Sequence, residues 1–172
     1  MRSSSSPITI PFIVLLLSYI ILSKIPDSYF QPYHPQISND PHSIYVPGSG
    51  FAGFWFTLGR LHSMKRLEEK NFYCYSSGCL GVLSVLTNTS VDDMMDHAFT
   101  VKNSWKNGEI STYDIVPEFV NRLITAFDND GINGLVLDRL NIITTTFGVG
   151  TNIQKANTTH ELREMLLQTT FM

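Results

Sequence analysis

Residues 71–86 read NFYCYSSGCLGVLSVL, and this stretch decides the fold. Its first part, Asn71–Tyr75, is short and aromatic, which is typical of a β-strand. Its last part, Cys79–Leu86, is apolar on nearly every side, which predicts a fully buried helix. Between the two, Ser76-Ser77-Gly78 forms a sharp break. A strand that turns abruptly into a buried helix is typical of layered α/β proteins.

A second unit of the same kind precedes this one. Ser43–Val46 is a strand candidate that Pro47-Gly48 stops, and the glycine-rich turn Gly48–Gly53 follows. Apolar residues then recur at helical spacing over Phe54–Leu67. Two strand–turn–helix units in succession predict parallel strands joined by helices.

The alternation continues towards the C-terminus. Helical spacing covers Asp92–Trp105 and Asp114–Phe127, and the β-branched run Leu140–Thr146 predicts a further strand. Thr158-x-x-Glu161 is a capping box that opens a last helix. One face of that helix carries Leu162, Met165 and Leu166. Residues 43–172 are therefore predicted to form an α/β domain with a mainly parallel sheet and helices on both faces.

The N-terminal third is a different kind of segment, because residues 1–59 carry only four charged side chains. Ile8–Leu22 is mostly apolar and marginally long enough for a membrane span of about 20 residues. We interpret residues 1–24 as an uncleaved signal anchor. A cleaved signal peptide and a buried soluble helix are the alternatives. Prolines punctuate residues 25–42, which predicts an extended linker.

This leader predicts a membrane-associated protein of the secretory pathway with a single-pass anchor, or a secreted or lumenal protein if the leader is cleaved. Two triplets, at Asn88 and Asn157, match the N-glycosylation pattern, which is frequent by chance.

Composition excludes several classes of protein. The chain has 172 residues, which favours one domain, and its net charge of −3 gives no footprint for a nucleic-acid partner. The histidines lack metal-ligand spacing, so we expect no metal and no cofactor. Cys74 and Cys79 are interpreted as buried, inert thiols rather than as ligands or a bridge.

Ser76 lies where acyl-transfer chemistry would need it. A sharp strand-to-helix turn lifts its central residue clear of the sheet and aims a helix N-terminus at it. Glycines at 48, 50 and 53 leave backbone N–H groups unobstructed. A serine oxygen beside such donors combines a nucleophile with an oxyanion site.

These motifs resemble those of the patatin-like phospholipase family. In that family a glycine-rich oxyanion loop precedes a G-x-S-x-G nucleophile elbow. Here the loop is Gly48-Ser49-Gly50-Phe51-Ala52-Gly53, and the elbow is Cys74-Tyr75-Ser76-Ser77-Gly78. The resemblance covers residues 43–172 and implies that Ser76 is the nucleophile and that the elbow ends at Gly78. Cys74 replaces the first glycine, and an alignment on Ser77 would lose both glycines. The implied oxyanion-hole residues are Gly48, Gly50, Phe51, Ala52 and Gly53.

The resemblance also implies a second catalytic residue that this chain lacks. The family uses a Ser–Asp dyad whose Asp lies in a D-G-G or D-G-A turn after the last helix. Asp130-Gly131 precedes the strand at 140–146 and is in the wrong order. We therefore expect a patatin-like layered fold without its final strands and Asp turn, from a truncated chain or a pseudoenzyme. The apolar face of the last helix would then lack a partner.

The resemblance implies a lipid acyl ester hydrolase whose substrate is a membrane lipid or another acyl ester. The alternative is a non-catalytic, membrane-tethered lipid-binding or interaction protein. Simpler interpretations also stay open: Gly48–Gly53 as an ordinary turn, and Ser76 as a helix N-cap. The glycine pattern also matches dinucleotide sites, but no acidic residue ends a following strand about 20 residues on to support such a site. Ser76, Asp138 and His160 also follow the order of an α/β-hydrolase triad. The aromatic cluster is interpreted as mostly core, part of it lining an acyl-chain pocket: Phe51, Phe54, Trp55 and Phe56.

Overall fold

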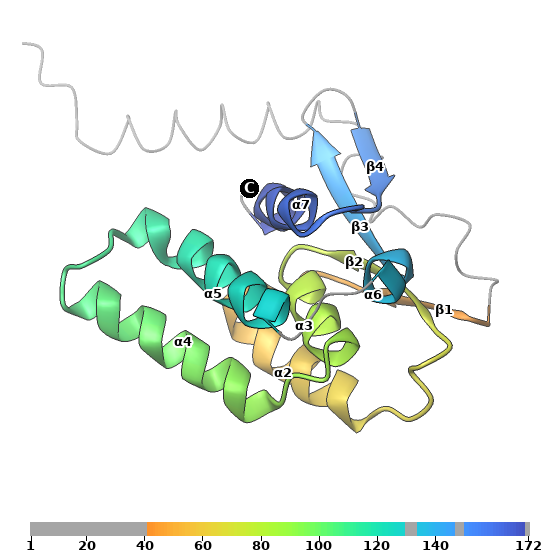
Figure 1. Ribbon diagram of the computed structural model, residues 1–172, viewed down its shortest axis with the longest axis horizontal. Coiled ribbons are helices and arrows are strands. Elements are labelled where there is room, and N and C mark those ends of the chain that lie inside the picture. The colour runs from red at the N-terminus through yellow and green to blue at the C-terminus, as the bar shows by residue number, and fades with distance from the viewer. Residues whose placement is uncertain (1–40, 130–133, 147–149, 171–172) are drawn as a thin grey trace, which may run out of the picture. The chain divides into compact units, whose positions relative to one another are not determined.

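The structure is a computed structural model that describes residues 41–129, 134–146 and 150–170 (Figure 1). The predictions for residues 1–24 and for nearly all of the linker lie outside these ranges. The elements in chain order are β1 (Ser43–Val46), α2 (Gly50–Ser63), β2 (Asn71–Tyr75), α3 (Ser77–Leu86), α4 (Val91–Lys106), the 3₁₀ turn η3 (Thr112–Asp114), α5 (Ile115–Asn129), α6 (Gly134–Arg139), β3 (Leu140–Thr146), β4 (Gly150–Gln154) and α7 (Thr159–Thr170).

The strands form a four-stranded sheet in the order β1-β2-β3-β4. The first three strands are parallel, with Val46 beside Cys74 and Cys74 beside Ile142. β4 pairs antiparallel with β3. The predicted α/β fold with a mostly parallel sheet is confirmed. β4 was not expected, because its sequence, GTNIQ, carries almost no apolar alternation.

The described helices gather on one side of the sheet (Figure 1). β1, β2 and β3 follow one another across the sheet, and right-handed crossovers between such strands all fall on the same face. α3 contacts all three parallel strands, and α2 and α7 both contact α3. Helices on both faces are therefore not confirmed within the described residues.

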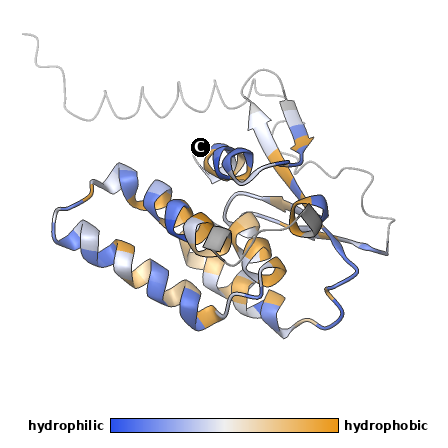
Figure 2. Cartoon of the chain, in the orientation of Figure 1, coloured by the Kyte–Doolittle hydropathy of each residue, from blue (hydrophilic) through white to orange (hydrophobic). Residues whose placement is uncertain are grey.

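The core lies between this helical layer and the inner face of the sheet. Phe72, Cys74 and Ile142 point into it and are fully buried. Leu162 and Leu166 of α7 are equally buried in this core, so the expectation that the last helix lacks a partner for its apolar face is wrong for these two residues. Figure 2 shows the same pattern: apolar positions concentrate where the helices meet, and polar positions cover the outer side of α4.

α2 begins earlier than the apolar spacing predicted, at Gly50 rather than Phe54. The glycine-rich turn is therefore the first turn of the helix itself. This matters for the site, because the backbone N–H groups at the start of a helix have no intrahelical acceptor.

Candidate functional site

Ser76 occupies the turn between β2 and α3 in a backbone conformation that residues other than glycine rarely adopt. Its φ is 52° and its ψ is −136°, and its hydroxyl makes no capping hydrogen bond to α3. A helix N-cap has extended backbone and uses its side chain, so the interpretation of Ser76 as an ordinary cap is not supported. A non-glycine residue at such angles costs about 1–3 kcal/mol and persists only where its surroundings hold it.

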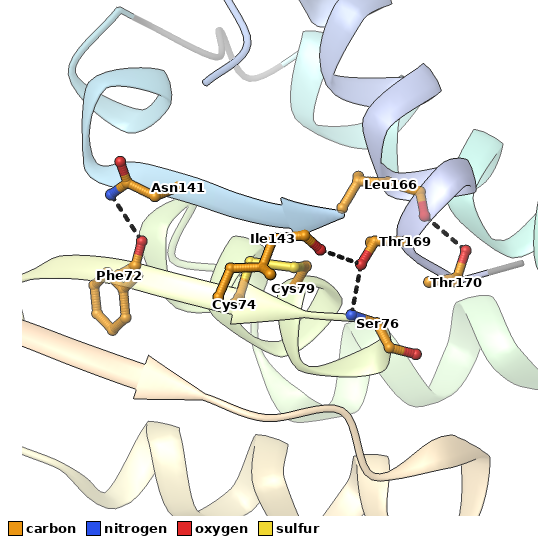
Figure 3. Close-up of a disulfide and its surroundings, with 9 residues drawn as sticks. All are labelled: Phe72, Cys74, Ser76, Cys79, Asn141, Ile143, Leu166, Thr169 and Thr170. Carbon is orange, nitrogen blue, oxygen red and sulfur yellow. Dashed lines mark hydrogen bonds between the residues drawn. A yellow bond between two sulfur atoms is a disulfide. The ribbon is translucent and has the colours of Figure 1, made fainter. Parts of the chain in front are cut away.

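Three hydrogen bonds hold the turn in place, and Figure 3 shows the two that involve Thr169. The Ser76 N–H donates to Thr169 Oγ1 of α7 at 2.8 Å, and the Thr169 hydroxyl donates to the Ile143 carbonyl of β3, also at 2.8 Å. The Cys79 N–H donates to the Ser76 carbonyl at 3.0 Å. Thr169 is buried. The turn is thereby tied to both a neighbouring strand and the last helix.

A disulfide also spans the turn. Cys74 at the end of β2 and Cys79 in the first turn of α3 are bonded to each other, with their Cα atoms 4.8 Å apart (Figure 3). The interpretation of these two residues as unpaired thiols is therefore wrong. The sharp turn at Ser76 brings the two Cβ atoms within bonding reach. The bridge spans Ser76. Cys74 occupies the position that the first glycine holds in the patatin-like elbow motif.

Two glycines allow the loop after β1 to lie against this turn. A Cβ atom on Gly48 would come within 2.7 Å of the Ser76 Cβ. A Cβ atom on Gly78 would come within 2.6 Å of the Pro47 carbonyl oxygen. Both distances are closer than real contacts allow. The glycine-rich loop and the serine turn, 26 residues apart in sequence, are therefore packed together.

The start of α2 offers the N–H groups of Gly50, Phe51 and Ala52. Its N-cap, Ser49, makes no side-chain capping bond to them. The Ser49 N–H donates to Ser77 Oγ at 3.1 Å, which ties the loop to the turn. The Gly53 N–H donates to the Ser49 carbonyl at 3.2 Å, so Gly53 is not available as an oxyanion donor as the resemblance implied.

No base accompanies Ser76 in the described part of the chain, where no side chain hydrogen-bonds to its hydroxyl. Asp138 lies in α6, which precedes β3, whereas Ser76 follows the end of the parallel strand β2. His160 is exposed in the first turn of α7, nine residues or about 13 Å of helix from Thr169. The Ser76–Asp138–His160 triad is therefore not assembled. Asp130-Gly131 lies outside the described residues.

One polar group near the turn was not expected from the sequence. Thr144 of β3 follows Ile143, which pairs with Tyr75, the residue before Ser76. Its hydroxyl is buried and has no hydrogen-bond partner among the described residues. The β-branched run that predicted the strand carries no signal that one of its hydroxyls would be unpaired.

Among the described residues, no three His, Cys, Asp or Glu side chains gather where they could hold a metal ion. His62 interacts with Ser84, with 3.1 Å between Nε2 and Oγ.

On the sheet, burial raises the pKa of Tyr45, and the nearby Tyr75 adds to this rise.

An apolar groove of about 660 Å³ opens between α2, α4 and α5. Phe51, the second residue of α2, is part of its wall and packs against Phe119 of α5 with 6.4 Å between ring centroids. Phe99 and Trp105 of α4 also line it and are 49% and 43% exposed. The interpretation of the aromatic cluster as mostly core is wrong, because only one of its four rings is fully buried. Phe51 and Trp55 line this apolar groove. Phe54 is core, and Phe56 is exposed outside the groove.

Comparison with protein-family models, curated proteins and solved structures gave no match to this chain. Across the described residues, every helix is too short or too polar to cross a membrane. The functional assignment of the site therefore depends on its geometry and on the motif resemblance.

Proposed function

We propose that this protein is a serine acyl hydrolase of patatin-like type that acts on lipid acyl esters. The observation that carries the proposal is the backbone of Ser76. A serine held at φ 52° and ψ −136° between a strand and a buried helix has the geometry of a nucleophile elbow. Strain of this kind is concentrated at functional sites.

The chemistry follows that of other serine hydrolases. Ser76 Oγ attacks the ester carbonyl carbon, its proton passes to a base, and the alcohol leaves with a proton to give an acyl-enzyme. Water then releases the fatty acid. The N–H groups of Gly50, Phe51 and Ala52 are the proposed donors to the oxyanion. The Ser76 N–H is not available for this role, because it donates to Thr169.

Turnover by this protein is expected to be slow. A general base contributes about 10²–10⁴-fold to such reactions, and no described side chain is placed to act as one. The membrane anchor proposed for residues 1–24 would keep the site close to lipid.

The second candidate is a non-catalytic, membrane-tethered lipid-binding protein. The unaccompanied Ser76 hydroxyl favours it, because an elbow without a base retains the oxyanion donors and the apolar groove but not efficient attack. Both candidates bind an acyl group, and they differ in whether Ser76 forms a covalent bond.

A fluorophosphonate probe separates the two candidates. We expect the purified chain to gain the mass of one phosphonyl group, and Ser76→Ala to abolish this gain. Ser63→Ala is the matched control, because Ser63 is exposed and its hydroxyl donates only to the Arg60 carbonyl. Ser77→Ala tests the neighbouring serine. A folded chain that takes up no probe after prolonged incubation would establish the non-catalytic candidate.

A further inference from the structure

We propose that the groove between α2, α4 and α5 binds a single long-chain fatty acyl group, with its carbonyl end at Phe51. The choice of an acyl group rests on the proposed function. The location, the orientation and the polar contact come from the groove itself. An apolar cavity of about 660 Å³ is within the usual size range of ligand pockets.

Continuity with the candidate site fixes one end of the groove. Phe51 contributes its ring to the groove wall, while its N–H is among the proposed oxyanion donors. Its ring lies against Phe119, in the second turn of α5. A chain entering beside Phe51 would therefore have its carbonyl at the start of α2, next to the loop that contacts Ser76.

Lys102 marks the same end. It is the one charged residue among those lining the groove in the described structure, and its Nζ lies 5.5 Å from the centroid of the Phe99 ring. One turn further along α4, Trp105 Nε1 donates to Thr112 Oγ1 just before α5, so this part of α4 lies beside the start of α5. A positive side chain at this end suits a carboxylate, and the rest of the groove is apolar.

The opposite end is lined by Met95 and Val91, towards the start of α4. Val91 and Trp105 are fourteen residues apart, or about 21 Å along the helix. This length suits an extended long acyl chain. A concave, elongated groove favours one inserted chain over a flat contact with a bilayer.

Both tryptophans of the chain, Trp55 and Trp105, line the groove, so intrinsic fluorescence reports on it directly. The experiment titrates the full chain and its Ser76→Ala variant with a dibrominated stearic acid below its micelle concentration. We expect saturable quenching in both proteins, reversed by unbrominated stearic acid. No saturable quenching would overturn the proposal. Probe labelling of Ser76 is a separate readout, so its failure would count against the proposed hydrolase alone.

Two phenylalanine variants provide the matched test. Phe99→Ala removes a groove wall, whereas Phe56→Ala removes an exposed ring, 75% accessible, that lies outside the groove. Loss of contacts worth one or two methylene groups corresponds to an affinity loss of about four- to fifteenfold, expected for Phe99→Ala only. Equal affinity in the two variants would refute the groove as the site.

Two further experiments test the carboxylate contact of Lys102 and distinguish a single bound chain from docking to a bilayer. We expect Lys102→Gln to weaken binding of the brominated acid but not of the corresponding brominated alcohol. An equal effect on both ligands would contradict the proposed carboxylate contact. If sedimentation with phosphatidylcholine vesicles depends on Phe56 as strongly as on Phe99, the surface is a membrane-docking face and the single-chain proposal is wrong.

Discussion

Reduction of the Cys74–Cys79 disulfide should destabilise the fold by about 2 kcal/mol. The bonded residues are five apart, and the chain-entropy relation gives about 2 kcal/mol for so short a loop. For a chain of this length, that corresponds to a fall in melting temperature of about 4–8 °C. Both cysteines are fully buried, so the bridge has to be reduced in the unfolded chain before refolding.

The assay is urea unfolding of wild-type protein refolded with and without a phosphine reductant. This comparison keeps both sulfur atoms and changes only the bond between them. Cys74→Ala/Cys79→Ala refolded with and without reductant is the control, and its two curves should coincide. A wild-type difference below about 0.5 kcal/mol would refute the reasoning, because the loop-closure relation predicts several times more. Alkylation of both cysteines in unfolded, unreduced protein would also refute it.

Reduction of the disulfide should also lower the reactivity of Ser76. The strain of Ser76 costs about 1–3 kcal/mol, which is comparable with what the bridge supplies. Without the bridge, the turn between β2 and α3 is free to relax towards ordinary helix-cap angles. We therefore expect fluorophosphonate labelling of Ser76 to slow in the reduced protein while the far-ultraviolet circular dichroism stays unchanged. An unchanged labelling rate would mean that the hydrogen bonds alone hold the turn.

Other substitutions probe the neighbouring contacts. Thr169→Val should cost about 1–3 kcal/mol in urea unfolding because it leaves the part-buried Ser76 N–H without an acceptor, and Thr169→Ser should restore most of this loss. Gly78→Ala should cost about 1–3 kcal/mol because its methyl group meets the backbone after β1. Thr144→Val should be neutral or stabilising by about 1 kcal/mol, since it removes a buried hydroxyl that lacks a partner, and clear destabilisation would point to a bonded hydroxyl. Hydrogen bonds from Ser90 lower the pKa of Asp93. Their stabilising effect is therefore present above the unfolded-state pKa of about 4 and is lost as the pH falls through the lower folded-state pKa. Ser90→Ala should flatten this part of the curve of stability against pH.

Much of the fold was predictable because its signals are local. Ser43–Val46, Asn71–Tyr75 and Leu140–Thr146 coincide with the observed strands, since each is a β-prone run bounded by turn residues. β4 was not predictable, because GTNIQ gains its stability from pairing with β3 rather than from its own apolar pattern. The early start of α2 was missed because glycine and apolar-spacing signals both disfavour a helix at residues 50–53.

The motif of the candidate site was predictable, but the disulfide and the hydrogen bonds that hold it were not. The two successive strand–turn–helix units and the motif resemblance predicted that the glycine loop would lie beside Ser76, and the close approach of Gly48 to Ser76 agrees with this. The disulfide was missed because two isolated cysteines five apart match no disulfide pattern; only the sharp turn brings them together. Thr169 was missed because its role depends on a contact 93 residues away in sequence.

This long-range contact determines when, during synthesis of the chain, the serine turn can be completed. The parallel strands join the sheet in the order in which a ribosome would synthesise them, so each has a paired edge waiting for it. Thr169, which accepts from the Ser76 N–H, is synthesised 93 residues after it. A nascent chain would therefore complete most of its sheet while the serine turn still lacks its acceptor. The hydrogen bond that holds the backbone of Ser76 would therefore form only after α7 has docked.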